Sequence, residues 1–333
     1  MPATGYTEKG NYIGANGVTT GTAFALPNYA GQLYSASPII TPLLNMISAK
    51  AVKTNNFQFP TGVEYIHEDA AQPAITETAS LTAPNPTSYV RSQNSNVTQI
   101  FQEKISVSYM AQSNAGRLTG INTAGAQNSV TNELDFQVQR AMEKIARDVE
   151  YTFLNGAYQL SDASNVANKT RGLLALTDSA ATNLTSNNVA AALTQTNLNA
   201  AFKAAYDAGA DFTDMVLFCN STVKQMLSVI YNDQKGVRLP ESRTAGGFNL
   251  ETIETDFGVM HIVIDRFMPA DKLLGVDISC VRPVEQDVPG KGNFFLEPLA
   301  KNGAAEEYQI FGQIGLDHGP AWKHFQIKGI KVD

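Results

Sequence analysis

The stretch NELDFQVQRAMEKIARDVEYTFLNG, residues 132–156, has the most regular spacing of apolar residues in the chain. These residues recur at steps of three and four, which places them on one stripe of an α-helix. The stripe consists of Leu134, Val138, Met142, Ile145, Val149 and Phe153. Thr131 or Asn132 can cap the start of such a helix, and Asn155-Gly156 can end it in a left-handed conformation. The sequence therefore predicts a helix over residues 132–155, about 35 Å long, with the stripe packed in the core.

The other faces of this predicted helix are charged. They carry Glu133, Asp135, Arg140, Glu143, Lys144, Arg147, Asp148 and Glu150. Glu143 and Arg147 are four residues apart, as are Lys144 and Asp148, and opposite charges at this spacing contribute roughly 0.3 kcal/mol each. Such faces are usually solvated, so we expect these charges at the surface.

The composition is poor in charge. Of 333 residues, 43% are hydrophobic and 17% are charged, and the formal net charge is −7. Typical soluble proteins have about a quarter of their residues charged, so this surface suits close contact with other protein. The negative balance argues against electrostatic binding of nucleic acid by the chain as a whole.

The cysteines and the lack of long apolar runs indicate the compartment. Cys219 and Cys280 each lie in an apolar run, which favours buried thiols of a reducing compartment over a disulfide. No apolar segment follows Met1, and no window approaches eighteen apolar residues, so we expect neither a secretion signal nor a membrane span. These features predict a soluble cytoplasmic protein.

The part of the chain before the helix is irregular. Residues 1–35 are rich in Gly, Thr, Asn and Ala without periodicity, so we expect an extended arm that only a partner orders. A short helix is predicted within residues 39–51. Strand-like runs at 57–66 and 97–108 enclose a segment with three prolines. A connection of this length is rarely an ordinary turn, and it predicts a protruding two-stranded flap.

The second half alternates helix-like and strand-like segments, which predicts a compact α/β unit over residues 195–285. Its predicted helices are 195–208 and 221–231, and its predicted strands are 215–219, 250–255, 258–265, 272–276 and 278–284. Strand-like runs then end the chain as an antiparallel set at 294–299, 307–316 and 322–332.

No motif in the sequence carries catalytic chemistry. A nucleophile elbow, a phosphate-binding glycine loop, a dinucleotide fingerprint and a Cys-x-x-Cys pair are all missing. The four histidines lack the spacing of metal ligands: His67, His261, His318 and His324. We therefore expect no enzyme activity, no catalytic residue, no cofactor and no bound metal.

Three segments together resemble the major capsid proteins of tailed bacteriophages. They are RSQNSNVTQIFQEKISVS at 91–108, the helix at 132–156 and TRGLLAL at 170–176. They follow the pattern N-x-x-x-T-Q-I-F, then a long helix ending in L-x-G, then R-G-L. The resemblance implies the α+β, HK97-like capsid fold. Its parts would be an N-arm at 1–56, an extended loop at 57–96, a peripheral domain at 97–174 and 288–333 with the spine helix 132–155, and an axial domain at 175–287.

This resemblance also implies a function. The chain would be a structural subunit that assembles with copies of itself, as hexamers and pentamers, into an icosahedral head around the phage double-stranded DNA. The arm and the extended loop would contact neighbouring subunits, with the candidate contact residues Glu68, Asp69, Arg91, Arg140, Glu143 and Arg147. The implied location is the virion capsid, assembled in the host cytoplasm. The implied partners are a separate scaffolding protein, a decoration protein, the portal and nonspecifically held DNA, with no membrane.

Other functions fit parts of the sequence. An encapsulin-type nanocompartment shell protein has the same fold as the phage capsid proteins. A secreted β-rich binding protein would share the richness in Asn and Thr, but it would need a signal peptide or a disulfide framework. A two-domain enzyme would need catalytic residues that the sequence does not offer.

Overall fold

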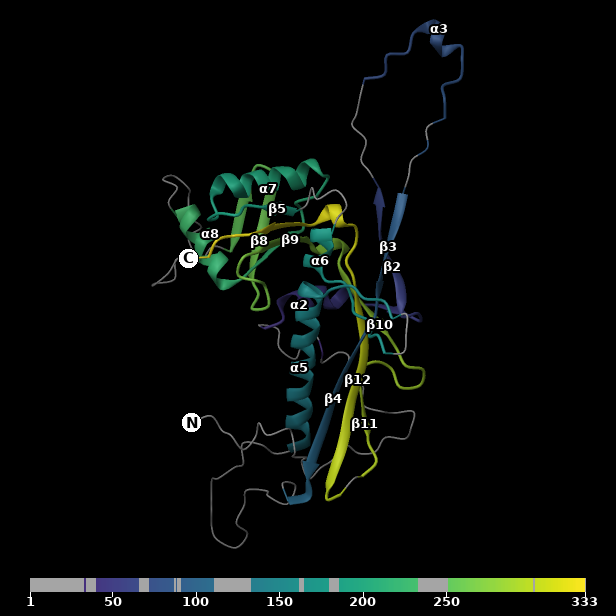
Figure 1. Ribbon diagram of the computed structural model, residues 1–333, viewed down its shortest axis with the longest axis vertical. Coiled ribbons are helices and arrows are strands. Elements are labelled where there is room, and N and C mark those ends of the chain that lie inside the picture. Colours follow the sequence, from purple (N-terminus) through teal and green to yellow (C-terminus); the bar gives the residue numbers. More distant parts are fainter. Residues whose placement is uncertain are drawn as a thin grey trace.

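The computed structural model describes residues 33, 40–65, 72–86, 88, 91–110, 133–161, 165–179, 186–232, 251–301 and 303–332. Most of the predicted arm lies outside these residues, as do Glu68, Asp69 and His67. The described chain forms two bodies, each built around its own sheet, and a long loop that projects beyond both (Figure 1). The mixture of helices and sheets confirms the α+β class.

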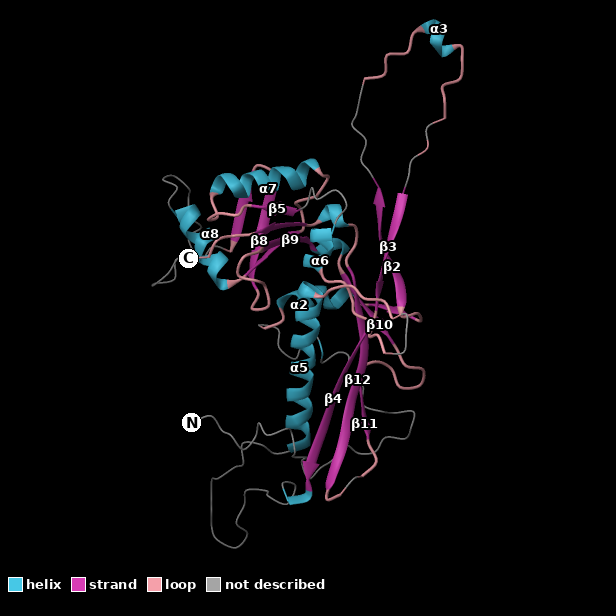
Figure 2. Ribbon diagram, viewed as in Figure 1, coloured by secondary structure: helices cyan, strands magenta, loops and turns pink. Residues whose placement is uncertain are grey.

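The first body is a five-stranded sheet with one long helix along it. Its strands are β1 (Val52–Thr54), β4 (Gln99–Ser108), β10 (Arg282–Gln286), β11 (Phe295–Pro298) and β12 (Ala305–Asp317). The central strand β12 pairs antiparallel with β4 on one side and with β10 and β11 on the other, and β1 pairs in parallel with β10. The helix α5 (Glu133–Asn155) lies along β4 and β12 (Figure 2). The predicted long helix is thus confirmed to within one residue.

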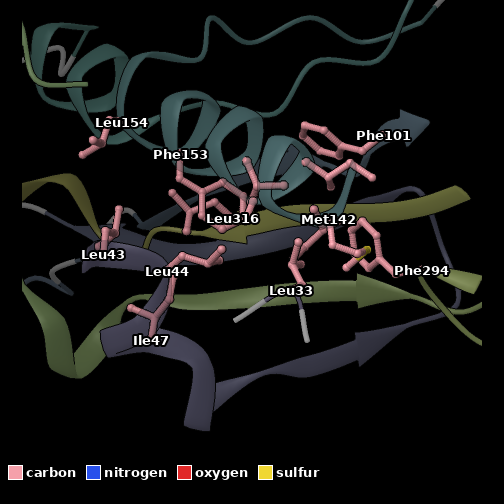
Figure 3. Packing of buried hydrophobic residues seen from close by; sticks show 14 of the residues in the cluster. Leu33, Leu43, Leu44, Ile47, Phe101, Met142, Phe153, Leu154, Phe294 and Leu316 are labelled. Carbon is pink, nitrogen blue, oxygen red and sulfur yellow. The ribbon is translucent and has the colours of Figure 1, made fainter. Parts of the chain in front are cut away.

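The apolar stripe of α5 forms the centre of the first core. Its six residues are each at most 4% exposed: Leu134, Val138, Met142, Ile145, Val149 and Phe153. They belong to one cluster with apolar residues of β4 and β12, among them Phe101 and Leu316 (Figure 3). Residues from the N-terminal region join the same cluster: Leu33, Leu43, Leu44 and Ile47. Each buried side chain of this size contributes about 2 kcal/mol, which holds the one-sided helix on the sheet.

The N-terminal helix α2 (Pro42–Ile47) is held against α5 by a buried carboxyl group. The side chain of Glu150 accepts hydrogen bonds from the backbone N–H groups of Leu43 and Leu44, each 2.8 Å long. Those N–H groups lie in the first turn of α2, where they have no partner inside the helix. The expectation that Glu150 is solvated is wrong, because Glu150 caps α2 and is fully buried.

The second body is a six-stranded mixed sheet with two helices packed on it, and its strand order is β5-β13-β9-β6-β8-β7. The strands are β5 (Ser186–Asn188), β6 (Met215–Cys219), β7 (Thr252–Thr255), β8 (Gly258–Ile264), β9 (Leu273–Asp277) and β13 (Phe325–Lys328). The helices are α7 (Gln195–Asp207) and α8 (Ser221–Asn232). Helices and sheet enclose a second core that includes Phe202, Leu217 and Phe325.

The chain passes between the two bodies three times, after α5, after β9 and after β12, and this corrects the predicted domain boundaries. The predicted axial segment 175–287 includes β10, which instead pairs with β1 and β12 in the first sheet. The predicted peripheral segment 288–333 includes β13, which instead pairs with β5 and β9 in the second sheet. The predicted arm 1–56 includes β1, which is an edge strand of the first sheet. Pairing between segments that are far apart in the sequence decides the positions of these strands, so no local sequence pattern reveals them.

The crossings after β9 and after β12 are short and hydrogen-bonded to each other. The first contains the 3₁₀ turn η2 (Ile278–Cys280), which interrupts the strand predicted over 278–284. The second runs from His318 to His324 and contains η3 (Ala321–Lys323). His324 Nδ1 accepts a hydrogen bond of 3.2 Å from the N–H of Asp277, and its Nε2 donates one of 2.7 Å to the carbonyl of His318. Burial lowers the pKa of both histidines, so they act here as neutral hydrogen-bonding groups.

The extended loop projects from the first body as a two-stranded ribbon. Its strands β2 (Gln58–Tyr65) and β3 (Arg91–Val97) pair antiparallel, and α3 (Glu77–Ser80) lies at the tip (Figure 1). The predicted protruding flap of two strands is therefore confirmed. The ribbon ends one residue later than the predicted segment 57–96, because Val97 still pairs with Gln58.

Both cysteines are free thiols, Cys219 buried and Cys280 partly buried. Burial raises the pKa of each thiol to about 12, so both stay protonated at neutral pH. Among the residues that the structure describes, no group of three His, Cys, Asp or Glu could hold a metal ion. Across the same described ranges, no helix has the length and the apolar character needed to cross a membrane.

Candidate assembly site

The base of the extended loop is fixed by a buried asparagine. Asn96, near the end of β3, is fully buried. Its Nδ2 group donates to the carbonyl oxygens of Leu316, at 2.7 Å, and Arg171, at 3.2 Å. Its Oδ1 atom accepts from the N–H of Arg171 at 2.7 Å. Because a buried amide is costly when unpaired, Asn96 specifies how β3, β12 and the segment after α5 meet.

A second set of hydrogen bonds joins neighbouring parts of the same segments. The N–H of Thr170 donates to Gln99 Oε1 at 3.3 Å, and the N–H of Leu316 donates to Thr170 Oγ1 at 3.2 Å. The N–H of Gly172 donates to the carbonyl of Gly156 at 2.8 Å. A β-carbon on Gly172 would lie 2.6 Å from the nitrogen of Gly156, so only glycine fits where the chain passes the end of α5.

These contacts give a physical reason for the three sequence segments 91–108, 132–156 and 170–176 to occur together. Residues from all three meet β12 at one place, which we name the loop-base joint: Asn96, Gln99, Gly156, Thr170, Arg171, Gly172 and Leu316. The joint ties the ribbon of β2 and β3 to the end of α5 and to the central strand of the first sheet. The extended loop therefore projects from a fixed base.

The charged face of α5 carries a compact ion network. Glu143 lies 2.7 Å from Arg140 and 3.9 Å from Arg147. Both arginine side chains are about half exposed, whereas that of Glu143 is 11% exposed. The Arg140 guanidinium also lies over the ring of Phe136, 5.5 Å from its centre. Three of the candidate contact residues thus form one cluster, which presents two arginines around a nearly covered glutamate.

The other predicted ion pair on α5 has a different partner. Lys144 Nζ lies 2.5 Å from Glu103 Oε2 on β4, and this hydrogen bond raises the pKa of Lys144. The prediction that Lys144 pairs with Asp148 is therefore wrong, because β4 runs beside α5 and offers a closer carboxylate.

The remaining candidate contact residues lie apart from the ion network. Arg91 is exposed at the first position of β3, in the projecting ribbon. Glu68 and Asp69 lie outside the described residues. Of the candidates that the structure describes, it brings the three residues on α5 together and leaves Arg91 separate.

The tip of the extended loop exposes apolar side chains that the charge pattern does not single out. Ile75 is 69% exposed and Leu81 is 84% exposed. Between them lies α3, whose start is capped by Thr76 Oγ1, which accepts from the N–H of Ala79 at 3.2 Å. Large exposed apolar side chains on a projecting element are typical of a surface that another protein covers. In the sequence, Ile75 and Leu81 can be noticed because they are single large apolar residues within a polar segment.

The family model of the SU10 major capsid protein matches residues 15–331, nearly the whole chain. The chain belongs to the SU10 major capsid protein family. No curated protein sequence matches this capsid protein.

Solved shell structures share the fold of this capsid protein. A chain of the cyanophage A-1(L) capsid asymmetric unit aligns with a TM-score of 0.62 at 13% identity, covering 88% of this chain and 93% of that chain. The capsid of the native GTA particle aligns with a TM-score of 0.56 at 13% identity, covering 94% and 96%. The SrpI encapsulin of Synechococcus elongatus PCC 7942 aligns with a TM-score of 0.51 at 10% identity, covering 88% and 89%. These likenesses show the HK97-like fold.

Family and fold together give the function. This is a major capsid protein, a structural subunit that assembles with copies of itself in the capsid of a virion. The family favours the phage capsid over the encapsulin shell and over the secreted binding protein. Within the capsid protein, α5 lies where the spine helix is predicted, and the ribbon of β2 and β3 lies where the extended loop is predicted.

Proposed function

We propose that this capsid protein forms hexamers and pentamers that close into an icosahedral head around phage double-stranded DNA, held together by the extended loops. The observation that carries the proposal is the loop itself, which projects beyond both cores (Figure 1). Near its tip the side chains of Ile75 and Leu81 are exposed. A ribbon of two strands is marginally stable when it stands alone, because it buries little of its own surface. It gains packing when its tip is covered by a neighbouring subunit.

Charge supports a particular docking place for this loop. Residues 66–90 contain three acidic residues, Glu68, Asp69 and Glu77, and neither lysine nor arginine. The ion network on α5 presents the half-exposed Arg140 and Arg147. In our proposal the acidic loop of one subunit lies over the spine helix of the next, where opposite charges fix the register of the contact.

The two bodies have separate places in the proposed shell. We assign β1, β4, α5, β10, β11 and β12 to the peripheral domain, and β5 to β9, α7, α8 and β13 to the axial domain around the centre of each hexamer or pentamer. The residues before Leu33 serve as an arm that contacts neighbours. The protein has no enzymatic role in this proposal. Assembly takes place in the host cytoplasm with a separate scaffolding protein, and a decoration protein and the portal complete the head.

Packaged DNA makes few contacts of its own in the proposed head. With a net charge of −7, the subunit offers phosphate groups little overall attraction. We therefore expect nonspecific DNA contacts that depend on a few local basic residues, and a shell that closes equally well without DNA.

Deletion of residues 68–86 tests the role of the loop. Because Ile75 and Leu81 belong to neither core, the variant is expected to fold with normal secondary structure by circular dichroism while forming no shells in negative-stain electron micrographs. A finer variant combines Ile75→Ser with Leu81→Ser, and its matched control is Thr78→Ser on the same tip. Intact particles from the deletion variant would contradict the proposal, as would equal loss of shells in the control.

A further inference from the structure

Glu150 lies where three separate parts of the fold meet. It belongs to the spine helix α5 and caps the N-terminal helix α2 through the two 2.8 Å hydrogen bonds from Leu43 and Leu44. The third part is the loop after β8, which begins at Asp265. Asp265 is fully buried, like Glu150.

The loop after β8 is seated on the C-terminal third of the spine helix. The N–H of Asp265 donates to the carbonyl of Cys219 at 2.9 Å, and Asp265 Oδ1 accepts from the N–H of Phe267 at 2.8 Å. Asn155 Nδ2 on α5 donates to the carbonyl of Phe267 at 2.9 Å, and the ring of Tyr151 meets that of Phe267 edge-on at 6.4 Å. This loop is therefore the contact of the second body with the end of α5.

The carboxyl groups of Glu150 and Asp265 are neighbours across this contact, close enough for a hydrogen bond between them. No N–H or hydroxyl group of the described residues donates to Asp265 Oδ2, which is buried. Two ionised carboxylates are both acceptors, so a hydrogen bond between them requires a proton on one of the two. The geometry thus calls for a pair that shares one proton and titrates as a unit.

No other charge within this contact replaces that proton. On the neighbouring residues of the same elements, Arg147, Asp148 and Arg266 are exposed. The helix α2, with the sequence PLLNMI, carries no ionisable side chain. On β6 the titratable group is the thiol of Cys219, which stays neutral because burial raises its pKa to about 12. Burial likewise raises the pKa of Glu150 and of Asp265, which favours a proton on the pair.

We propose that Glu150 and Asp265 form a proton-dependent latch that fastens α2 and the loop of the second body to the spine helix. With one shared proton, the latch is closed and every donor and acceptor in it is paired. Loss of the proton leaves two buried negative charges facing each other, and the contact opens. The latch lies within one subunit, so it does not rest on the proposed docking of the extended loop.

The sign of the pH dependence follows from the raised pKa values. The ordinary pKa values of the two groups are 4.5 for Glu150 and 3.8 for Asp265, and folding raises both. The stabilisation by the latch is therefore complete below the ordinary values and is lost as the pH rises through the raised values. Alkaline conditions open the latch and acidic conditions close it.

Hydrogen exchange in the full-length protein, followed by mass spectrometry, tests the latch. The amides of Leu43 and Leu44 report on it, because Glu150 is their acceptor. Their protection factors, normalised to the peptide of α7, are expected to fall about tenfold between about pH 5 and about pH 9. Constant protection of these amides in the wild-type protein would overturn the proposal without any variant.

The variant Asp265→Asn sharpens the test, because its amide group donates permanently to Glu150 and needs no proton. It is expected to hold the protection of Leu43 and Leu44 within about twofold across the same pH range. The matched control is Asp271→Asn, an exposed aspartate of the same body, which should lose protection as the wild type does. If Asp265→Asn loses protection with rising pH as steeply as the control, the shared proton is not the switch.

Discussion

Gly62 passes so close to Pro320 that a β-carbon on the glycine would lie 2.2 Å from the proline nitrogen. Gly62 lies where the register of the ribbon shifts, between Pro60 and Val63 of β2. Pro320 belongs to the crossing after β12. The extended loop is therefore anchored on this crossing as well as on the central strand of the first sheet.

Substitution of Gly62 by alanine should destabilise the subunit. The atoms that the new methyl group would meet belong to the backbone of Gly319 and the backbone and ring of Pro320, which cannot rotate aside. We expect the free energy of unfolding to fall by about 3 kcal/mol, measured by denaturant titration. Gly290→Ala is the control: nothing lies within 4 Å of its β-carbon, and its positive φ costs about 1 kcal/mol. Equal losses in both variants would show that the contact at Gly62 is not tight.

Replacement of Asn96 by alanine should loosen the loop-base joint. It leaves the carbonyls of Leu316 and Arg171 without their side-chain donor in a buried place. The expected loss is about 2–4 kcal/mol in the free energy of unfolding. Asn45→Ala, at an exposed position of α2, should cost less than about 1 kcal/mol by the same measurement. A small loss at Asn96 would mean that water or another side chain can take its place.

Neutralising the two arginines on the spine helix should weaken assembly without unfolding the subunit. Glutamine keeps a hydrogen-bond donor beside the nearly covered Glu143, so Arg140→Gln with Arg147→Gln should lower the thermal midpoint only slightly. We expect the concentration needed for shells to rise about tenfold in light scattering, as it should for the wild type when salt is added. Lys203→Gln removes a charge from the exposed pair with Asp207 on α7 and serves as control. An unchanged assembly threshold in the double variant argues against docking of the loop on this face.

The stability should also fall in mild acid because of His318. Burial lowers its pKa from 6.5 to about 4, so the unfolded chain takes up a proton before the folded protein does. The stabilisation is present above pH 6.5 and is lost as the pH falls to about 4, to the extent of about 3 kcal/mol. His318→Gln should flatten this part of the pH profile of denaturant unfolding, whereas His261→Gln, at an exposed position, should not.

The contribution of His318 is separable from that of the carboxyl pair, because the two have opposite signs. The pair stabilises more as the pH falls, and His318 stabilises less. In the background of Asp265→Asn the opposing contribution of the pair is removed, so the net acid-induced loss of stability should be larger than in the wild type. Identical profiles with and without His318 would show that folding does not lower the pKa of this histidine.

Local patterns explain how much of the fold can be predicted from the sequence. The stripe from Leu134 to Phe153 repeats with the period of a helix, and such a pattern is complete within the segment itself. The extended loop is likewise visible, because prolines and scattered apolar residues separate two strand-like runs. In both cases the physical cause lies within a few tens of consecutive residues.

The features that the sequence does not reveal depend on distant partners. Glu150 has the spacing of a solvated residue on α5, and only the arrival of α2, more than 100 residues earlier in the chain, makes it buried. The assignment of β10 and β13 to the wrong bodies has the same cause, because strand pairing across the chain decides it. The sequence shows that Ile75 and Leu81 are apolar, but it does not show that they are exposed, because their exposure results from the projection of the ribbon.

The interleaved path of the chain affects its synthesis. Neither body is encoded by one uninterrupted stretch, since β13 enters the second sheet only after β12 has completed the first. During translation, therefore, the first core is incomplete until β12 has been synthesised, and the second core is incomplete until β13 has been synthesised. A product terminated before Phe325 lacks Phe325 and Ile327 from the second core and cannot close it. Products that end before Phe325 are therefore expected to keep an open second core, which would make them poor building blocks for a shell.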